Sequence, residues 1–352
     1  MSAVTGRPRP GGVDVGHVDV HTHILPPHWP DLEKRYGVGG WVQLEHCPGC
    51  RSRMLRDGKV FREVDPNCFD EAARLRECDE AGVGAQVLST VPVMFSYDKQ
   101  PAHALDLAML LNDHIADLVA RFPSRFAGLA TVPLQTPEAA ARELERAMRS
   151  GHAGAQIGTH VNGWNLDDEA LEPFWQAAND LGASLFVHPW DMLGQSHMTR
   201  HWLPWLVGMP MELSLAICSL TMGGVLSRYP RIRFMFAHGG GAFSGTVGRI
   251  DHGFEARPDL CQTRTAQPPS SFLDKIWVDA LVHDLRTLRF TVDLYGDTRV
   301  ALGTDYPFPL GEAQPGALIR SAGFAPDTQR RLLRGNAIDW LGGAGRPLQD
   351  VS

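Results

Sequence analysis

The stretch Val18-Asp19-Val20-His21-Thr22-His23 joins a short apolar run to two histidines two residues apart. Residues i and i+2 of a strand point to the same side, so a strand here directs both imidazoles to one point at its carboxyl end. Seven similar runs follow, and most lack the polar–apolar alternation of a half-exposed strand. The eight runs are His17–Val20, Ala85–Thr90, Phe126–Val132, Ala153–Ile157, Ser184–His188, Ile232–His238, Lys275–Ala280 and Arg299–Gly303.

Segments between these runs carry apolar residues at helical spacing. They include Glu71–Ala81, His103–Arg121, Glu138–Arg149, Glu169–Leu181 and Met211–Arg228. Eight buried strands alternating with helices predict a parallel α/β fold, and eight strands close a barrel. A doubly wound open sheet is the alternative, although no G-x-G-x-x-G follows the first strand. We therefore expect a distorted (β/α)₈ TIM barrel over residues 17–345.

Three segments do not fit this alternation. Residues 1–16 are rich in Gly, Pro and Arg and lack the apolar core of a signal peptide, so we expect a disordered leader. Residues 24–70 contain several prolines and predict an insertion after the first strand, which in a barrel lies over the C-terminal face. The stretch Leu193–Pro210 predicts a second long loop on that face. Cys47-Pro48-Gly49-Cys50, inside the insertion, has no second C-x-x-C and is either part of a metal or redox site or a pair of loop cysteines without function.

Composition excludes several classes of function. The 352 residues are 43% hydrophobic and 21% charged, which is ordinary for a globular protein. A formal net charge of −7 argues against nucleic acid or an anionic membrane as the main partner. No apolar run reaches the ~18 residues of a membrane span. Six cysteines do not form a disulfide scaffold in a chain of this length, so we expect a reduced, cytoplasmic environment.

Polar residues follow four of the apolar runs, where the catalytic residues of barrels usually lie. The set His21, His23, His188 and Asp305 offers three imidazoles and one carboxylate, which suits Zn²⁺ and leaves a position for a water molecule. A metal lowers the pKa of such a water from ~15.7 towards ~7, and His238 would be the base that takes its proton. Each residue taken alone is equally well explained as a histidine at a strand end or an aspartate capping a helix.

A second metal in such a barrel would need a bridging ligand, often a carbamylated lysine on the fourth strand. The chain has no lysine between Lys99 and Lys275, so we expect one zinc ion per subunit.

This arrangement resembles the amidohydrolase superfamily, and longer segments narrow the resemblance to the 2-amino-3-carboxymuconate-6-semialdehyde decarboxylase family. It covers the chain from about Val18 to about Leu341. The segments are GGWVQLEH (39–46), LSTVPVMFSY (88–97), AQIGTHVNGW (155–164), LFVHPWDM (185–192), WLPWLVGMP (202–210), FAHGGGAF (236–243), DALVHD (279–284) and LGTDYPFPLGE (302–312).

The resemblance implies a role for each candidate residue. It assigns the zinc ligands to His21, His23, His188 and Asp305 and the catalytic histidine to His238. It further assigns substrate binding to Arg62 and Trp205, and to Arg249 of the neighbouring subunit, which would make a homodimer the active form; Arg257, two helical turns later, is the rival for that arginine. The implied substrate is a small dicarboxylate, which arginine can grip through two parallel hydrogen bonds.

The expected function is therefore zinc-dependent, non-oxidative decarboxylation. The resemblance implies that 2-amino-3-carboxymuconate 6-semialdehyde becomes 2-aminomuconate 6-semialdehyde and CO₂, with a metal-bound hydroxide generated by His238. It implies a place in tryptophan (kynurenine) catabolism or in a bacterial nitroaromatic route. The alternatives are an aromatic-acid decarboxylase of dihydroxybenzoate type, a lactone or amide hydrolase of the same superfamily, and a binding protein without activity, which predicts an empty metal site.

Overall fold

Parallel strands form the centre of the molecule, in a computed structural model that describes residues 16–47 and 51–349. Eight strands lie in the order β1-β5-β6-β7-β10-β11-β12-β13, and each pairs in parallel with the next. They are β1 (His17–Ile24), β5 (Val83–Thr90), β6 (Phe126–Ala130), β7 (Gly154–Gly158), β10 (Ser184–His188), β11 (Arg233–Phe236), β12 (Trp277–Asp279) and β13 (Val300–Ala301). Each of the eight predicted runs overlaps one of these strands, and β1 and β5 are longer than predicted.

The sheet closes between its last and first strands. The Val20 N–H donates to the Leu302 carbonyl at 2.9 Å, and the His23 N–H donates to the Tyr306 carbonyl at 2.8 Å. Because β13 is only two residues long, most of this seam is made by the loop that follows it. The predicted distorted (β/α)₈ barrel is confirmed, and this seam is where it departs from regularity.

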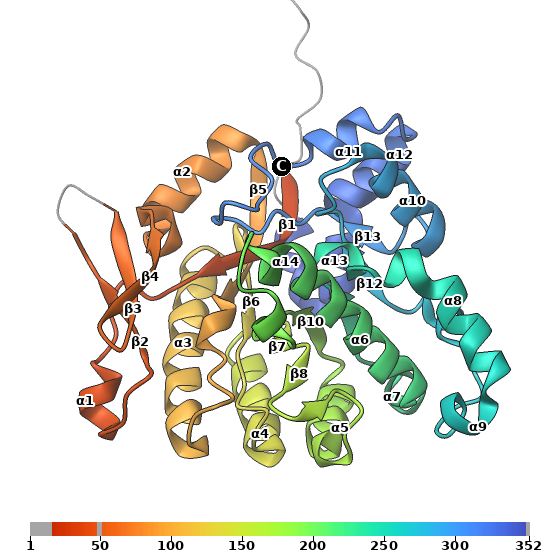
Figure 1. Cartoon of the computed structure of the whole chain (residues 1–352). Helices are drawn as coiled ribbons and strands as arrows, with labels where there is room; N and C mark the ends of the chain where they lie inside the picture. The colour runs from red at the N-terminus through yellow and green to blue at the C-terminus, as the bar shows by residue number, and fades with distance from the viewer. Residues whose placement is uncertain (1–15, 48–50, 350–352) are drawn as a thin grey trace, which may run out of the picture.

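A helix follows every strand of the barrel and covers its outside (Figure 1). The covering helices are α2 (Glu71–Ala81), α3 (Pro101–Arg121), α4 (Pro137–Arg149), α5 (Glu172–Leu181), α6 (Met209–Met222), α8 (Phe243–Ala256), α10 (Leu285–Tyr295) and α13 (Asn336–Leu341). Shorter helices are α1 (Leu32–Tyr36), α7 (Val225–Arg228), α9 (Pro258–Cys261), α11 (Ala317–Ser321), α12 (Pro326–Arg330) and α14 (Arg346–Gln349), and a small hairpin is formed by β8 (His160–Val161) and β9 (Trp164–Asn165). Helix α2 has the predicted bounds because Asp70 caps its first turn and Gly82 ends it in the left-handed conformation.

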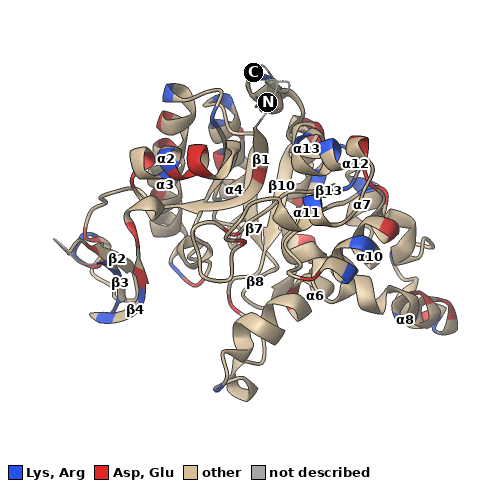
Figure 2. Ribbon diagram, turned by 90° about the horizontal axis from the view of Figure 1, so that it is seen from above, with Lys and Arg blue, Asp and Glu red and all other residues tan. Residues whose placement is uncertain are grey.

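The long connection after β1 folds into a sheet of its own. Strands β2 (Val42–Glu45), β3 (Ser52–Arg56) and β4 (Lys59–Val64) form a three-stranded antiparallel sheet. This insertion sheet has a separate apolar core, in which buried Trp41 and Met54 pack with Leu107 and Leu111 of α3. It stands on one side of the barrel, and α8 lies on the opposite side (Figures 1 and 2).

Two sequence features fall partly or wholly outside the described residues. The expected leader, residues 1–16, is described only at Gly16. Of the C-x-x-C segment only Cys47 is described, and it is disulfide-bonded.

The expected long loop Leu193–Pro210 is wrong in its second half. Residues Pro204–Gly208 form a π-helical turn that continues directly into α6. Proline is well suited to a first helical turn, where its missing N–H costs nothing, and it starts the helix here. The helix therefore begins earlier than the apolar periodicity predicted.

The helical stretch Pro204–Met222 has the length and apolar composition of a membrane span. In the structure its inner side packs into the barrel core through Leu213, Ile217 and Leu220. Glu212 on the same helix is buried and accepts a 2.7 Å hydrogen bond from Thr159. One side of this stretch thus packs in the barrel core, while Leu206, Val207, Met211 and Leu215 remain exposed.

Candidate metal centre and active site

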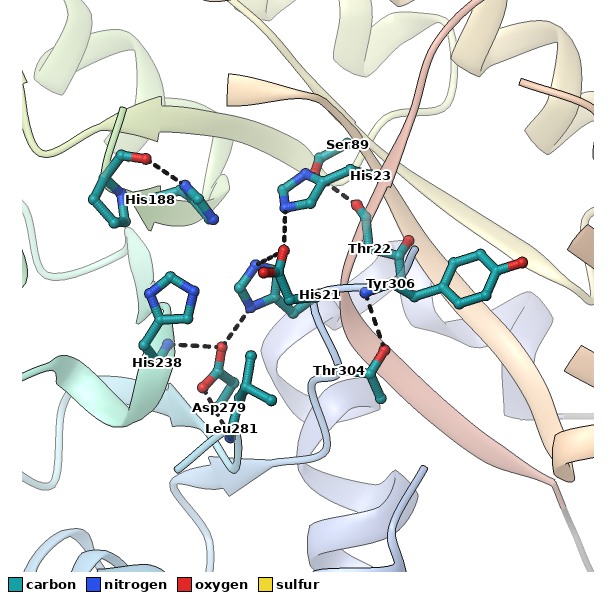
Figure 3. A network of polar contacts seen from close by, with 12 residues as sticks. His21, Thr22, His23, Ser89, His188, His238, Asp279, Leu281, Thr304 and Tyr306 are labelled. Atoms are coloured by element: carbon teal, nitrogen blue, oxygen red, sulfur yellow. Dashed lines mark hydrogen bonds and ion pairs between the residues drawn. The ribbon is translucent and has the colours of Figure 1, made fainter. Parts of the chain in front are cut away.

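Four predicted ligands meet at the carboxyl ends of the barrel strands. His21 and His23 lie on β1, His188 ends β10, and Asp305 follows β13 in the loop of the seam. Ligand atoms of all four residues lie within 4.8 Å of one another. The three imidazoles come from opposite sides of the barrel and point toward a common centre (Figure 3).

The hydrogen-bond partner of Nδ1 determines the tautomer of each imidazole. The Nδ1 atoms of His21, His23 and His188 lie 2.7 Å from Asp279 Oδ2, 3.1 Å from the Thr90 carbonyl and 2.6 Å from the Pro189 carbonyl, respectively. Carboxylate and carbonyl oxygens only accept, so each Nδ1 carries the proton and each Nε2 presents a lone pair.

These three lone pairs converge without a donor. The Nε2 atoms of His21, His23 and His188 are buried, and none has a hydrogen-bond partner among the described residues. The Nε2 atoms of His21 and His23 instead face Asp305 Oδ1, at 3.5 and 3.1 Å. Acceptors facing acceptors at this distance are compatible with a cation between them, so the residues fit a metal ion.

Protonation in the cluster follows from burial and from the charged neighbours. Burial raises the pKa of the Asp305 carboxyl, but His23, His21 and His238 outweigh it, and the pKa lies below its usual value. Burial lowers the pKa of His23 and lowers that of His188 well below the usual value. Burial also lowers the pKa of His21, but the hydrogen bond to Asp279 and the nearby carboxylates together raise it by more, so the pKa of His21 lies above its usual value. An ionised carboxylate beside neutral His23 and His188 is the state that binds a divalent cation.

Sequence reasoning missed Asp279, at the end of β12. This buried carboxylate accepts from His21 Nδ1 and from the backbone N–H groups of His238, Gly239 and Leu281. The available signal was its position near the end of the seventh apolar run, Lys275–Ala280, comparable to that of His188 at the end of the fifth. Asp279 thus connects a predicted ligand to the predicted catalytic histidine.

His238 lies beside the cluster and is not one of its four members. Its ring centroid is 5.1 Å from that of His21 and 5.2 Å from that of His188. Burial, reinforced by His21, lowers its pKa to about 4, so the imidazole is neutral at pH 7 and able to accept a proton.

The glycines after His238 are required by the backbone. Gly239 has φ +63°, and a Cβ there would lie 2.5 Å from Val282; Gly241 has φ +64°, and a Cβ would lie 2.3 Å from the Pro210 carbonyl. Only glycine fits both demands, and the tight turn sets the His238 and Gly239 N–H groups against Asp279.

Two cavities of about 300 Å³ flank the cluster, and both are lined by Trp205 and Asp305. The first contains Arg62 and Arg56 of the insertion sheet together with His23 and His188. The second contains His238 with apolar neighbours such as Leu281 and Val282. The Arg62 guanidinium lies over the Phe308 ring at 4.4 Å and has no carboxylate partner among the described residues. It is therefore available to an anionic ligand.

Arg249 is the one predicted site residue that lies apart from the others. It is exposed on α8 and is not among the described residues that line either cavity. Arg257, just beyond α8, is also exposed and forms a 2.6 Å ion pair with Asp259.

A (β/α)₈ barrel whose strand ends bring together H-x-H, histidine and aspartate defines a class of metal-dependent barrel enzymes. The family model "Amidohydrolase" matches residues 18–343, and the chain belongs to this family. It is 53% identical over 92% of its length to a 2-amino-3-carboxymuconate-6-semialdehyde decarboxylase from Dictyostelium discoideum, of which 91% is covered. It is 35% identical to the enzyme of the same name from Caenorhabditis elegans, with 92% and 94% of the two chains covered.

The chain is thus a member of the 2-amino-3-carboxymuconate-6-semialdehyde decarboxylase family and a carboxy-lyase. A solved structure with the same fold is a dihydroxybenzoic acid decarboxylase from Polaromonas with bound manganese and 2-nitroresorcinol. Its TM-score is 0.74 at 21% identity, and 93% of this chain and 96% of that one are covered.

Proposed function

We propose that this decarboxylase removes one carboxylate of 2-amino-3-carboxymuconate 6-semialdehyde, with one zinc ion per subunit. The observation that carries the proposal is the convergence of three unpartnered Nε2 atoms on Asp305, with His238 alongside and Arg62 facing the same centre. The names of the two relatives support the substrate. With that substrate, the enzyme would act in tryptophan (kynurenine) catabolism or in a nitroaromatic route.

The donor set supports zinc over harder cations. His21, His23 and His188 supply imidazole nitrogen, which suits zinc, whereas manganese prefers oxygen ligands. The manganese in the Polaromonas relative makes it the competing metal. When bound, the metal would act as a Lewis acid and lower the pKa of a coordinated water.

The chain's own residues supply binding and proton transfer. Arg62 holds a carboxylate that the substrate keeps, because a planar guanidinium can donate two parallel hydrogen bonds to it. Neutral His238 takes a proton from water and returns one to the carbon from which CO₂ departs. The net change is one C–C bond broken, one C–H bond formed and one proton consumed, so no redox cofactor is needed.

A homodimer with Arg249 in trans is the second part of the proposal. The helical stretch that includes α6 exposes Leu206, Val207, Met211 and Leu215, and α8, which carries Arg249, packs beside α6. Such a contiguous apolar face favours a protein partner. Arg249 is preferred to Arg257 because Arg257 is already paired with Asp259.

Mixed dimers test the trans arrangement. His238→Ala and Arg249→Ala homodimers should each be inactive. After random mixing, half of the dimers are hybrids, and each hybrid has one site with both residues. The mixture should therefore regain about a quarter of wild-type activity if Arg249 acts across the interface. If no activity returns although native mass spectrometry detects the hybrids, Arg249 does not act in trans.

The substrate is tested by assay of the zinc-loaded enzyme. The semialdehyde is generated in situ, oxygen is removed, and the loss of its absorbance and the release of CO₂ are followed together. Stoichiometric CO₂, lost in His238→Ala with zinc retained, is the expected result. Only the slow spontaneous cyclisation to quinolinate, with zinc present, would reject the substrate.

An aromatic acid is the second candidate substrate. The likeness to dihydroxybenzoic acid decarboxylases supports it, and 2,6-dihydroxybenzoate, which is bound in one solved structure of this fold, is the competing substrate in the same assay. We further propose a cytoplasmic location, which the four free cysteines support and the disulfide at Cys47 opposes.

A further inference from the structure

A buried arginine on α2 contacts the backbone beneath the metal centre. Arg74 has no exposed surface, although it is charged. None of the described residues forms an ion pair with it. Burying a guanidinium without a carboxylate opposes stability, so its presence calls for another explanation.

The contacts of Arg74 lead to two of the predicted metal ligands. Its Nη2 donates to the backbone carbonyl of His23, and its Nη1 donates to Gln86 at 2.9 Å. Its guanidinium lies over the ring of Tyr306, 4.7 Å from the centroid. Tyr306 directly follows Asp305, so one side chain contacts both His23 and the neighbour of Asp305.

Two further bonds complete this connection. The carbonyl of Tyr306 accepts from the His23 N–H at 2.8 Å. The Tyr306 hydroxyl donates to Glu77, one helical turn after Arg74, at 2.6 Å. The Tyr306 ring points away from the three histidines, so α2 holds it from the side opposite the metal centre (Figure 3).

We propose that Arg74 is a positioning residue for the metal. It sets the distance between His23 and Asp305, whose ligand atoms lie 3.1 Å apart, by fixing the backbone of one and the adjacent aromatic ring of the other. The two ligands come from opposite ends of the chain and meet at the irregular seam of the barrel. His23 is paired with β5 on its other side, whereas Asp305 lies in the loop after the two-residue strand β13. The inference rests on the metal site of the proposed function and deepens it.

Metal affinity and the ligand field test the proposal without reference to activity. Arg74→Met keeps the volume but removes the donors. Its dissociation constants for Zn²⁺ and Co²⁺, measured against a chromophoric chelator, should rise about 10- to 100-fold, as is typical when partners of metal ligands are lost. The visible absorption of the Co²⁺ form should change as well, because the geometry at the ion changes.

A matched control separates positioning from general stability. Arg233→Met removes another arginine without a carboxylate partner, which donates to the Trp340 carbonyl at 2.5 Å at the start of β11, away from the metal ligands. It should leave both readouts at wild-type values even if the protein becomes less stable. Arg74→Lys can still reach the His23 carbonyl but cannot also stack on Tyr306, so it should lie between wild type and Arg74→Met.

Further variants keep the proposal testable if Arg74→Met does not fold. Tyr306→Leu removes the ring beneath the guanidinium and should weaken metal binding in the same direction, whereas Tyr306→Phe keeps the ring and should weaken it less. Unchanged dissociation constants and Co²⁺ spectra in Arg74→Lys and Tyr306→Leu, or in a folded Arg74→Met, would overturn the proposal. A wild-type protein that binds neither metal would instead overturn the proposed function.

Discussion

Individual side chains at the strand ends decide which atoms a metal would meet. His21 presents Nε2 to the centre only because Asp279 accepts from its Nδ1 at 2.7 Å. The same carboxylate accepts from the backbone N–H groups of His238 and Gly239. One residue outside the four predicted ligands therefore sets both the tautomer of His21 and the position of the predicted catalytic histidine, His238.

Changing this carboxylate to an amide should weaken metal binding. In Asp279→Asn one oxygen becomes an NH₂ group, which faces a donor and cannot accept from it. We expect metal affinity to fall about 10- to 100-fold, as measured by chelator competition. Asp284→Asn makes the same chemical change at the exposed cap of α10 and should have no effect. Wild-type metal affinity in Asp279→Asn would show that the tautomer of His21 does not depend on the Asp279 carboxylate.

A second residue-scale prediction concerns the pH dependence of stability. Burial lowers the pKa of His152 to about 4; its Nδ1 donates to the Ala147 carbonyl at 3.0 Å, and its Nε2 has no partner among the described residues. Because the unfolded chain binds a proton at higher pH than the folded one, this histidine lowers stability as pH falls from about 6.5 toward 4.

Replacing the imidazole should remove that contribution. Between pH 6.5 and 4.5, the free energy of unfolding of wild type should fall by about 2 kcal/mol more than that of His152→Gln, as measured by urea denaturation at both pH values. Exposed His197→Gln is the control and should keep the wild-type slope. Equal slopes for wild type and His152→Gln would mean that His152 titrates normally in the fold.

At the scale of elements, the insertion sheet brings a cation to the barrel mouth. Arg62 on β4 pairs in register with Met54 on β3, so their side chains share one face of the sheet. Met54 is fully buried in the separate apolar core, and Arg62 lines the first cavity beside His188. The packing of Met54 therefore determines where the Arg62 guanidinium lies.

Emptying that core should affect substrate binding more than metal binding. Met54→Ala leaves a cavity beneath Arg62, and a substitution of this kind typically costs 2–5 kcal/mol in stability. We expect KM to rise several-fold, with the metal dissociation constant unchanged. Leu55→Ala alters the next residue of β3, on the other face of the sheet, and should raise KM less. Equal KM values in the two variants would show that the position of Arg62 does not depend on the packing of Met54.

The same elements explain what the sequence could and could not predict. Buried strands have a clear apolar signature, and a polar residue at or just beyond the end of such a strand lies at the mouth of a barrel. For this reason His188 and Asp305 could be located from the residues alone. Arg62 could not, because its place depends on antiparallel pairing within a sheet that the apolar pattern does not reveal. Arg74 could not be predicted for another reason: in the sequence, a buried arginine cannot be distinguished from a solvated arginine of an amphipathic helix.

The whole molecule should gain stability from the metal. The four predicted ligands come from three separate parts of the chain and meet only in the folded state, so an ion that binds them would stabilise that state. Zinc at about 1,000 times its dissociation constant should add about 4 kcal/mol to the free energy of unfolding. Calorimetry with zinc and then with chelator should show a Tm difference of several degrees. Asp305→Asn should lose most of this zinc-dependent Tm shift. A shift equal to that of wild type would mean that zinc binds at another site.

The insertion sheet has its own apolar core, separate from that of the barrel. Arg62, which would bind the substrate, thus rests on a different apolar cluster from the one that packs around the barrel strands, although the two clusters adjoin at Leu25, after β1, and at α3. Substitutions within strands β2, β3 and β4 would therefore alter which acid the first cavity accepts more than they alter the four predicted metal ligands. For protein engineering, a library of substitutions confined to this sheet would vary the preferred substrate while leaving the four predicted metal ligands unchanged.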